Sequence, residues 1–85
     1  MSVKSALRSA RVALDANNYT DALRWCQDAL ELESNNYHAY VFMGVAQMHL
    51  KNFKSSEQAF RDAIVLNPKA PLAHQVKLFF FPPPY

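Results

Sequence analysis

The stretch YTDALRWCQDALELESNN, residues 19–36, returns 34 positions later as FKSSEQAFRDAIVLNPKA, residues 53–70. Both stretches begin with an aromatic residue and carry a small residue three positions on. They share an alanine ten positions on, at Ala29 and Ala63, and then run through aliphatic residues to a polar or proline-containing stop. A repeat of this length indicates a chain built by using one structural unit more than once.

The apolar residues step by three and four positions in four segments, which is the spacing of amphipathic helices. The predicted helices are Val3–Leu14, Tyr19–Leu32, Tyr37–Leu50 and Phe53–Leu66. Pro68 ends the fourth helix, because the residue before a proline avoids the helical region. A fifth helix is expected to start near Ala70 or Pro71, since proline is tolerated in a first helical turn.

Small and aromatic residues occupy regular positions in the second unit, and these are Gly44, Ala46, Phe53, Phe60, Ala63 and Pro68. With the period of 34 residues, this pattern resembles the tetratricopeptide repeat family. The first unit matches at Tyr19, Ala22 and Ala29, but carries Ala10 for the usual glycine and Cys26 for the usual aromatic residue.

The resemblance covers Lys4 to about Gln75 and implies an all-α solenoid of two helix-turn-helix hairpins plus a partial third repeat helix. The expected division is residues 3–36 for repeat 1, 37–70 for repeat 2, 71–81 for the partial helix of a third repeat and 82–85 for a proline-rich tail without regular structure. About three such units are usually needed for stability. We therefore expect the isolated chain to be marginally stable, and either partly molten or self-associating through its exposed end.

The small residues predict where helices approach closely. Ala46 and Ser56 are expected to let the two helices of the second hairpin cross, and Gly44 to give close contact with the preceding hairpin. Phe53 and Phe60 are expected to wedge between hairpins, where each would bury roughly 150–250 Å².

Composition excludes several classes of partner. A net charge of +2 over 85 residues predicts no direct nucleic-acid binding, because that function needs a concentrated basic face. No apolar run approaches the roughly 18–20 residues that cross a bilayer, so no membrane partner is expected. The lone Cys26 excludes an internal disulfide and fits a reducing compartment, which predicts the cytoplasm, with the nucleus as a second location.

No catalytic, cofactor or metal site is predicted, and the chain is not expected to be an enzyme. His38, His49 and His74 lack the spacing of metal ligands, and one glycine cannot make a phosphate-binding loop. Cys26 falls on a core position, where thiols are usually inert.

The resemblance implies protein binding on the concave face, which the first helix of each hairpin lines. The predicted peptide-binding groove comprises Lys4, Leu7, Arg8, Arg11, His38, Val41, Phe42, Val45, Met48 and His49. An apolar patch with a basic shoulder suits a segment with apolar anchors and acidic residues. The alternative is that a neighbouring repeat of a longer chain covers Val41, Phe42 and Val45.

Some members of the family bind chaperone carboxylates through a clamp of Lys, Asn, Asn, Lys and Arg. The matching positions carry Leu7, Arg11, Phe42, Leu72 and Val76, so no such docking is expected.

Residues 3–46 more specifically resemble the N-terminus of a long tetratricopeptide scaffold that holds a helicase and other subunits of a cytoplasmic complex feeding messenger RNA to the exosome. This resemblance implies a scaffold with protein partners. The alternatives are an unrelated peptide-binding adaptor or the regulatory arm of a larger enzyme.

The final stretch, PLAHQVKLFFFPPPY from Pro71, departs from the repeat pattern after Gln75. Three interpretations remain open for residues 76–85. They are translated intron sequence, an apolar cap folded onto the end of the array, or a ligand for WW domains, which read the Pro-Pro-x-Tyr pattern in a polyproline helix.

Overall fold

The structure is a computed structural model and describes residues 2–71. The described part of the chain is helical and contains no β-strand. Its four helices are α1 (Val3–Asp15), α2 (Tyr19–Leu32), α3 (Tyr37–His49) and α4 (Phe53–Leu66). The prediction of four helices is confirmed, and α3 ends one residue early because Leu50 is its C-cap. No described helix has the length and apolarity needed to cross a membrane.

Polar residues cap the starts of α1 and α3, the two helices that we call the inner helices because they line the face expected to be concave. The Ser2 hydroxyl accepts a hydrogen bond from the Ser5 backbone N–H at 3.1 Å, and the Asn36 side chain accepts one from the Ala39 N–H at 2.9 Å. Each bond satisfies a donor that has no partner inside the helix, a contribution of typically about 1 kcal/mol.

The turn inside each hairpin has the same backbone geometry. Asn17 and Lys51, 34 residues apart, both take a positive φ, of 62° and 65°. After the first of these, the Asn18 N–H donates to the Ala13 carbonyl at 2.7 Å, which closes the end of α1. This left-handed residue is the usual way to end a helix and reverse the chain.

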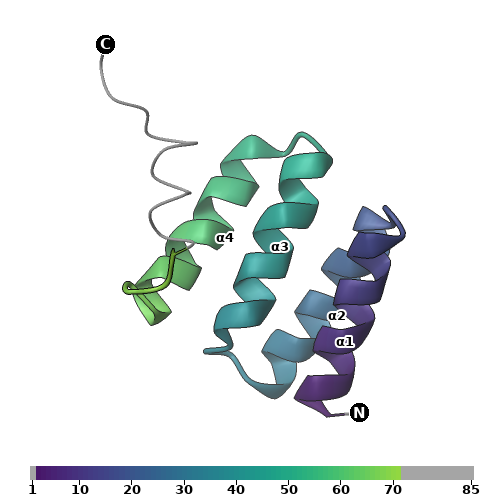
Figure 1. Ribbon diagram of the computed structural model, residues 1–85, viewed down its shortest axis with the longest axis horizontal. Helices are drawn as coiled ribbons and strands as arrows, with labels where there is room; N and C mark the ends of the chain where they lie inside the picture. The colour runs from purple at the N-terminus through teal and green to yellow at the C-terminus, as the bar shows by residue number, and fades with distance from the viewer. Residues whose placement is uncertain (1, 72–85) are drawn as a thin grey trace.

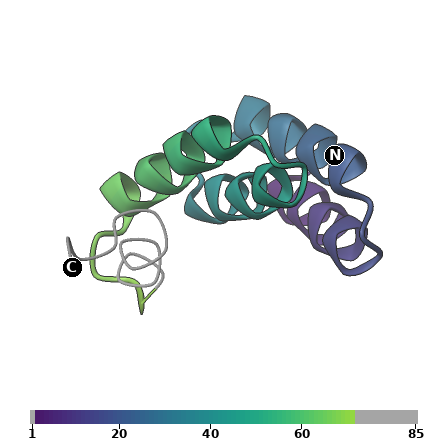
Figure 2. The same cartoon turned by 90° about the horizontal axis from the view of Figure 1, so that it is seen from above.

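The helices form two layers. In Figure 2, α1 and α3 lie together on one side of the molecule and α2 and α4 on the other. Helices α1 and α2 pair as the first hairpin and α3 and α4 as the second, and α3 also packs against α2 and touches α1 (Figure 1). This is the arrangement of two hairpins stacked side by side. The limits 3–36 and 37–70 for the two repeats remain a prediction.

Small side chains form the core. Two clusters, Ala6 with Ala29 and Ala39, and Ala13 with Ala22 and Ala46, each join α1, α2 and α3. Among residues 2–71, the largest side chains that are fully buried are those of Cys26 and Ser56. Short side chains at the contacts allow the helix axes to approach closely, so the sequence pattern of alanines sets the packing.

The expected roles of Gly44 and Ala46 were wrong and are exchanged in the structure. Ala46 contacts Ala13 and Ala22 of the first hairpin, whereas Gly44 faces α4 of its own hairpin. A Cβ on Gly44 would lie 2.7 Å from a ring carbon of Phe60. Residues two positions apart lie about 200° apart around a helix with 3.6 residues per turn, so Gly44 and Ala46 occupy opposite flanks of α3.

The two phenylalanines that are expected to wedge between hairpins differ in exposure, and the third hairpin that they would meet lies outside the described residues. Phe60 is 4% exposed and packs on Gly44 within its own hairpin, whereas Phe53 is 53% exposed at the start of α4. Tyr19, the equivalent of Phe53 in the first hairpin, is shielded because it stacks on His49 of the next hairpin. Phe53 would need a third hairpin to be covered in the same way.

The predicted third-repeat helix over residues 71–81 and the tail over 82–85 lie outside the described residues, apart from Pro71.

Candidate protein-interaction surfaces

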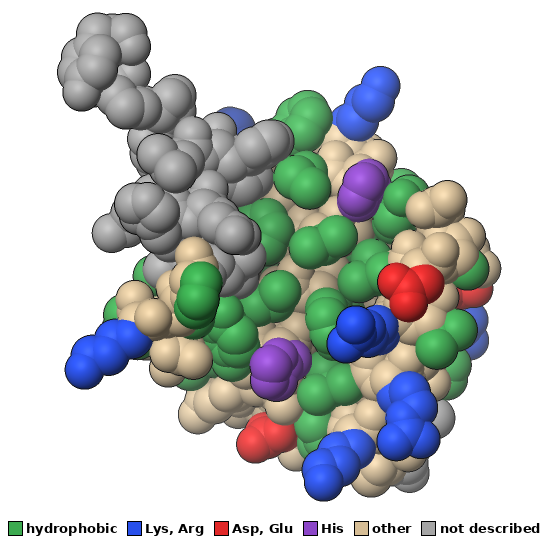
Figure 3. Space-filling model, in the orientation of Figure 1, with side chains coloured by type: hydrophobic (Ala, Val, Ile, Leu, Met, Phe, Trp, Pro, Cys, Tyr) green, Lys and Arg blue, Asp and Glu red, His purple; other side chains and the backbone are tan. Residues whose placement is uncertain are grey.

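All ten residues of the predicted groove lie on the two inner helices. Helix α1 carries Lys4, Leu7, Arg8 and Arg11, and helix α3 carries His38, Val41, Phe42, Val45, Met48 and His49. Figure 3 views this inner face, where hydrophobic side chains gather over α3 and toward α1. The structure therefore gathers the predicted residues on two neighbouring helices, while their role in binding remains a prediction.

The side chains on the inner face differ in accessibility. The charged residues and the two histidines are exposed, whereas the apolar residues are partly buried. Leu7 packs against the cluster of Ala6, Ala29 and Ala39, so part of its surface belongs to the core. The accessible apolar strip of the inner face is supplied by α3, and we define it as Val41, Phe42, Val45 and Met48.

The basic residues of α1 have no acidic partner in the described part of the chain. Lys4, Arg8 and Arg11 are all exposed, and the ion pair between Arg61 and Glu57 at 2.7 Å lies on α4. Lys and Arg side chains accordingly gather over α1 in Figure 3. Unpaired cations beside an apolar strip attract anionic groups and give a charged ligand its orientation.

Both described histidines contact aromatic rings. His49 stacks on Tyr19, with ring centroids 4.4 Å apart and planes at 3°, and this stack links the start of α2 to the end of α3. The His38 ring lies 5.4 Å from that of Tyr37 and 6.5 Å from that of Phe42. The His49 stack therefore joins the two hairpins, whereas the His38 contacts lie within α3.

Cys26 is buried on α2, as its core position in the sequence predicts. Desolvation raises the pKa of its thiol to about 12. A thiol with such a pKa stays protonated at neutral pH and is a poor nucleophile. Among residues 2–71, no cluster of three or more His, Cys, Asp and Glu side chains could hold a metal ion.

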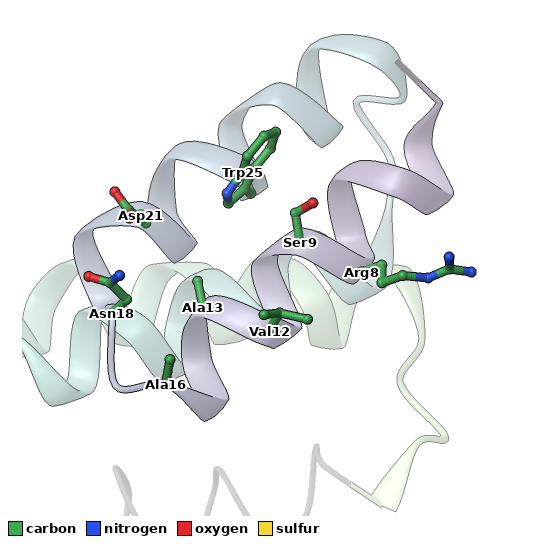
Figure 4. A pocket seen from close by; sticks show the side chains of 8 residues that line it. All are labelled: Arg8, Ser9, Val12, Ala13, Ala16, Asn18, Asp21 and Trp25. Atoms are coloured by element: carbon green, nitrogen blue, oxygen red, sulfur yellow. The ribbon is translucent and has the colours of Figure 1, made fainter.

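The sequence analysis missed a second surface, at the edge of the first hairpin that faces away from α3. A cleft of about 400 Å³ between α1 and α2 is lined by Arg8, Ser9, Val12, Ala13, Ala16, Asn18, Asp21 and Trp25 (Figure 4). Val12 and Trp25 take the positions of Ala46 and Ala59 in the second hairpin, both of which are buried. Large side chains where the next repeat has alanine were the signal that could have revealed this edge.

Comparisons with known proteins agree with the helical repeat. The family model described as tetratricopeptide repeat matches residues 13–78. No solved structure gives a significant match.

The similar proteins are much longer than this chain. Superkiller complex protein 3 of Mus musculus is 42% identical over 73 residues, which cover 86% of this chain and 5% of that protein. Superkiller protein 3 of Schizosaccharomyces pombe is 43% identical over 72 residues, 85% of this chain and 5% of that protein. Tetratricopeptide repeat protein 12 of Homo sapiens is 34% identical over 68 residues, 80% of this chain and 9% of that protein.

The chain thus spans about 5% of the length of its superkiller relatives. The match of the family model over most of the sequence, together with the stacked hairpins, identifies the chain as a member of the tetratricopeptide repeat family.

Proposed function

We propose that this chain is a protein-binding part of a superkiller-type scaffold, which holds helicase-type and other subunits of a multiprotein complex and so assists exosome-mediated messenger-RNA decay in the cytoplasm. The similarity to the superkiller proteins supports this role. The module itself acts by non-catalytic protein interaction, in keeping with its family.

The observation that carries the proposal is the inner face. Lys4, Arg8 and Arg11 on α1 are exposed, and none of them forms an ion pair within residues 2–71. Lys4 and Arg11 flank the apolar strip of α3, whereas Arg8 also lines the edge cleft. A ligand that matches both features is a segment with apolar anchors and acidic side chains. The anchors lie over the apolar strip, and the acidic side chains meet the cations of α1.

The energetics divide between the two halves of the surface. Burial of the apolar strip supplies most of the free energy of binding, at about 25 cal/mol for each Å² removed from water. The cations steer the ligand and fix its direction, and this part of the binding weakens as salt is added. The groove therefore selects a ligand segment that combines apolar anchors with an acidic flank.

The proposed location is the cytoplasm, with the nucleus as a second location. The protonated, buried thiol of Cys26 is compatible with the reducing interior of a cell.

A binding experiment with a synthetic peptide tests the groove. The probe is a fluorescein-labelled helical peptide of about 15 residues, with leucines on one face and glutamates flanking them. We expect the double variant Lys4→Glu, Arg11→Glu to bind it at least about tenfold more weakly, because each contact changes from attraction to repulsion. Fluorescence anisotropy at low and high salt measures the affinity.

The matched control places the same charge change on the outer helices. Arg24 and Lys54 are exposed on α2 and α4, so Arg24→Glu, Lys54→Glu has the same net charge without touching the inner face. Equal losses in the two double variants would mean that net charge alone controls binding, and the groove would be rejected. Tighter binding of an RNA oligonucleotide than of the peptide would also reject it.

A further inference from the structure

The cleft at the edge of the first hairpin is the counterpart of a surface that is covered in the second hairpin. There α2 packs against the flank of α3 that carries Ala39 and Ala46. The same flank of α1 carries Ser5 and Val12, and Val12 is 62% exposed. The described part of the chain therefore covers this flank in one hairpin and leaves it open in the other.

The charges along the cleft are arranged with opposite signs at its two ends. Figure 4 shows Arg8 at one end and Asp21 at the other, with Val12 and Trp25 between them. Arg8 and Asp21 are both exposed, and neither forms an ion pair within residues 2–71. Val12 and Trp25 supply an apolar centre.

We propose that this edge is the interface of a homodimer, in which two copies pair through their clefts about a two-fold axis. A two-fold axis through the apolar centre turns one cleft end for end relative to the other. Arg8 of each copy then faces Asp21 of its partner, and the two apolar centres meet. A two-fold interface requires that a surface complement itself, and opposite charges on either side of an apolar centre satisfy that requirement.

A second copy fits this surface better than a ligand of the inner face does. The inner face carries cations on α1 beside apolar residues on α3, so it has one sign of charge and suits an acidic segment. The edge cleft carries Arg8 at one end and Asp21 at the other. A second copy related by a two-fold axis offers Asp21 to the first residue and Arg8 to the second, so both charges are paired. This pairing also differs from the self-association that the sequence predicts through the opposite, exposed end.

Charge reversal in the full 85-residue chain tests the symmetry. Sedimentation velocity over roughly a hundredfold range of concentration should reveal a reversible dimer of the unaltered chain. Arg8→Glu places a second carboxylate against Asp21 twice in each dimer, and Asp21→Lys places a second cation against Arg8 twice. Each single variant should raise the dimer dissociation constant at least about tenfold, because like charges oppose each other at both ends.

Mixing the two variants supplies the decisive observation. In the mixed dimer both end pairs are again of opposite charge, so the two variants together should form a heterodimer near the affinity of the unaltered chain. Native mass spectrometry can identify that species by mass. The control Arg24→Glu changes charge on α2 outside the cleft and should leave the dimer unchanged.

Three results would overturn the proposal. They are a monomer at every concentration, a dimer that both single variants leave intact, and a mixture that fails to restore pairing. The third result would indicate that Arg8 of one copy does not face Asp21 of the other. The exposed-site variant Val12→Asp should weaken the dimer and retain the circular dichroism of the folded chain.

The dimer and the peptide groove can fail separately. Arg8 belongs to both surfaces, so Arg8→Glu does not separate them. Val12 and Asp21 lie outside the predicted groove, so Val12→Asp and Asp21→Lys should bind the acidic peptide as the unaltered chain does. If the unaltered chain forms the dimer but does not bind the peptide, the groove alone is rejected.

Discussion

At the scale of single residues, the two hairpins fill one pair of equivalent buried positions with side chains of different size. The second hairpin pairs Gly44 with Phe60, whose ring occupies the space that a Cβ would need. At the equivalent positions the first hairpin has Ala10 and Cys26, a larger residue on the inner helix and a smaller one on the outer helix. Both Ala10 and Cys26 are fully buried. The departures of the first unit from the family pattern are therefore related to each other.

We predict that Gly44→Ala destabilises the chain and lowers the free energy of unfolding by up to about 2 kcal/mol. Overpacking against Phe60 costs typically 1–3 kcal/mol, and the better helix propensity of alanine offsets roughly 1 kcal/mol of that. In the background of Phe60→Cys the same change should become stabilising. Urea unfolding of the four chains in this double-mutant cycle measures the coupling, and strict additivity would contradict the account.

The second residue-scale prediction concerns Cys26, whose thiol pKa is raised to about 12 by desolvation from an ordinary value of 9.0. Below about pH 9 the thiol is neutral in both the folded and the unfolded chain. As the pH rises from 9 toward 12, the thiol ionises in the unfolded chain only, so the free energy of unfolding decreases.

Comparison with Cys26→Ala isolates this effect from the titration of lysines and tyrosines. We expect the unaltered chain to lose more stability than the variant between about pH 8 and about pH 10.5. A thiol reagent should also react with the unaltered chain only after unfolding. Rapid labelling of the native protein would show that the thiol is accessible.

At the scale of elements, the turn inside each hairpin depends on one residue with a left-handed backbone. Asn17 serves the first turn, and its side chain accepts a hydrogen bond of 2.9 Å from the Tyr19 hydroxyl. Lys51 serves the second turn without being one of the residue types that favour this conformation. The second turn therefore holds backbone strain that the first turn largely avoids.

We predict that Lys51→Gly stabilises the chain, by up to about 1.5 kcal/mol. Removing the left-handed strain contributes roughly 1–2 kcal/mol, and the extra backbone entropy of glycine in the unfolded chain takes back about 0.5–1 kcal/mol. The matched change Asn17→Gly should give no gain, since asparagine tolerates this conformation and its bond to Tyr19 would be lost. Thermal unfolding of both variants compares the two turns, and equal gains would count against this explanation.

The sequence predicted the helices better than their contacts. Spacing of apolar residues located all four helices, because one periodicity runs through each of them. It misassigned Gly44 and Ala46 because α3 is apolar on both flanks, so spacing alone does not tell which flank meets the partner helix and which meets the preceding hairpin. The edge cleft was missed for a related reason. In the sequence Val12 is one more apolar position of the stripe, and only the packing of the helices shows that it is exposed.

At the scale of the whole molecule, the two layers of helices have different roles. The outer helices α2 and α4 support the stack, and the inner helices α1 and α3 present side chains on one face (Figures 2 and 3). The sequence placed the ten groove residues on these two helices from the family resemblance. It could not assign their exposure, because burial depends on how closely the hairpins stack.

The central claim is that partners bind the inner face, and mapping by NMR tests it most directly. Titration of the isotope-labelled 85-residue chain with the acidic, leucine-bearing peptide should shift the backbone amides of α1 and α3. The amides of α2 and α4 should stay largely in place. Shifts concentrated on α2 and α4, or spread evenly over the chain, would contradict the claim.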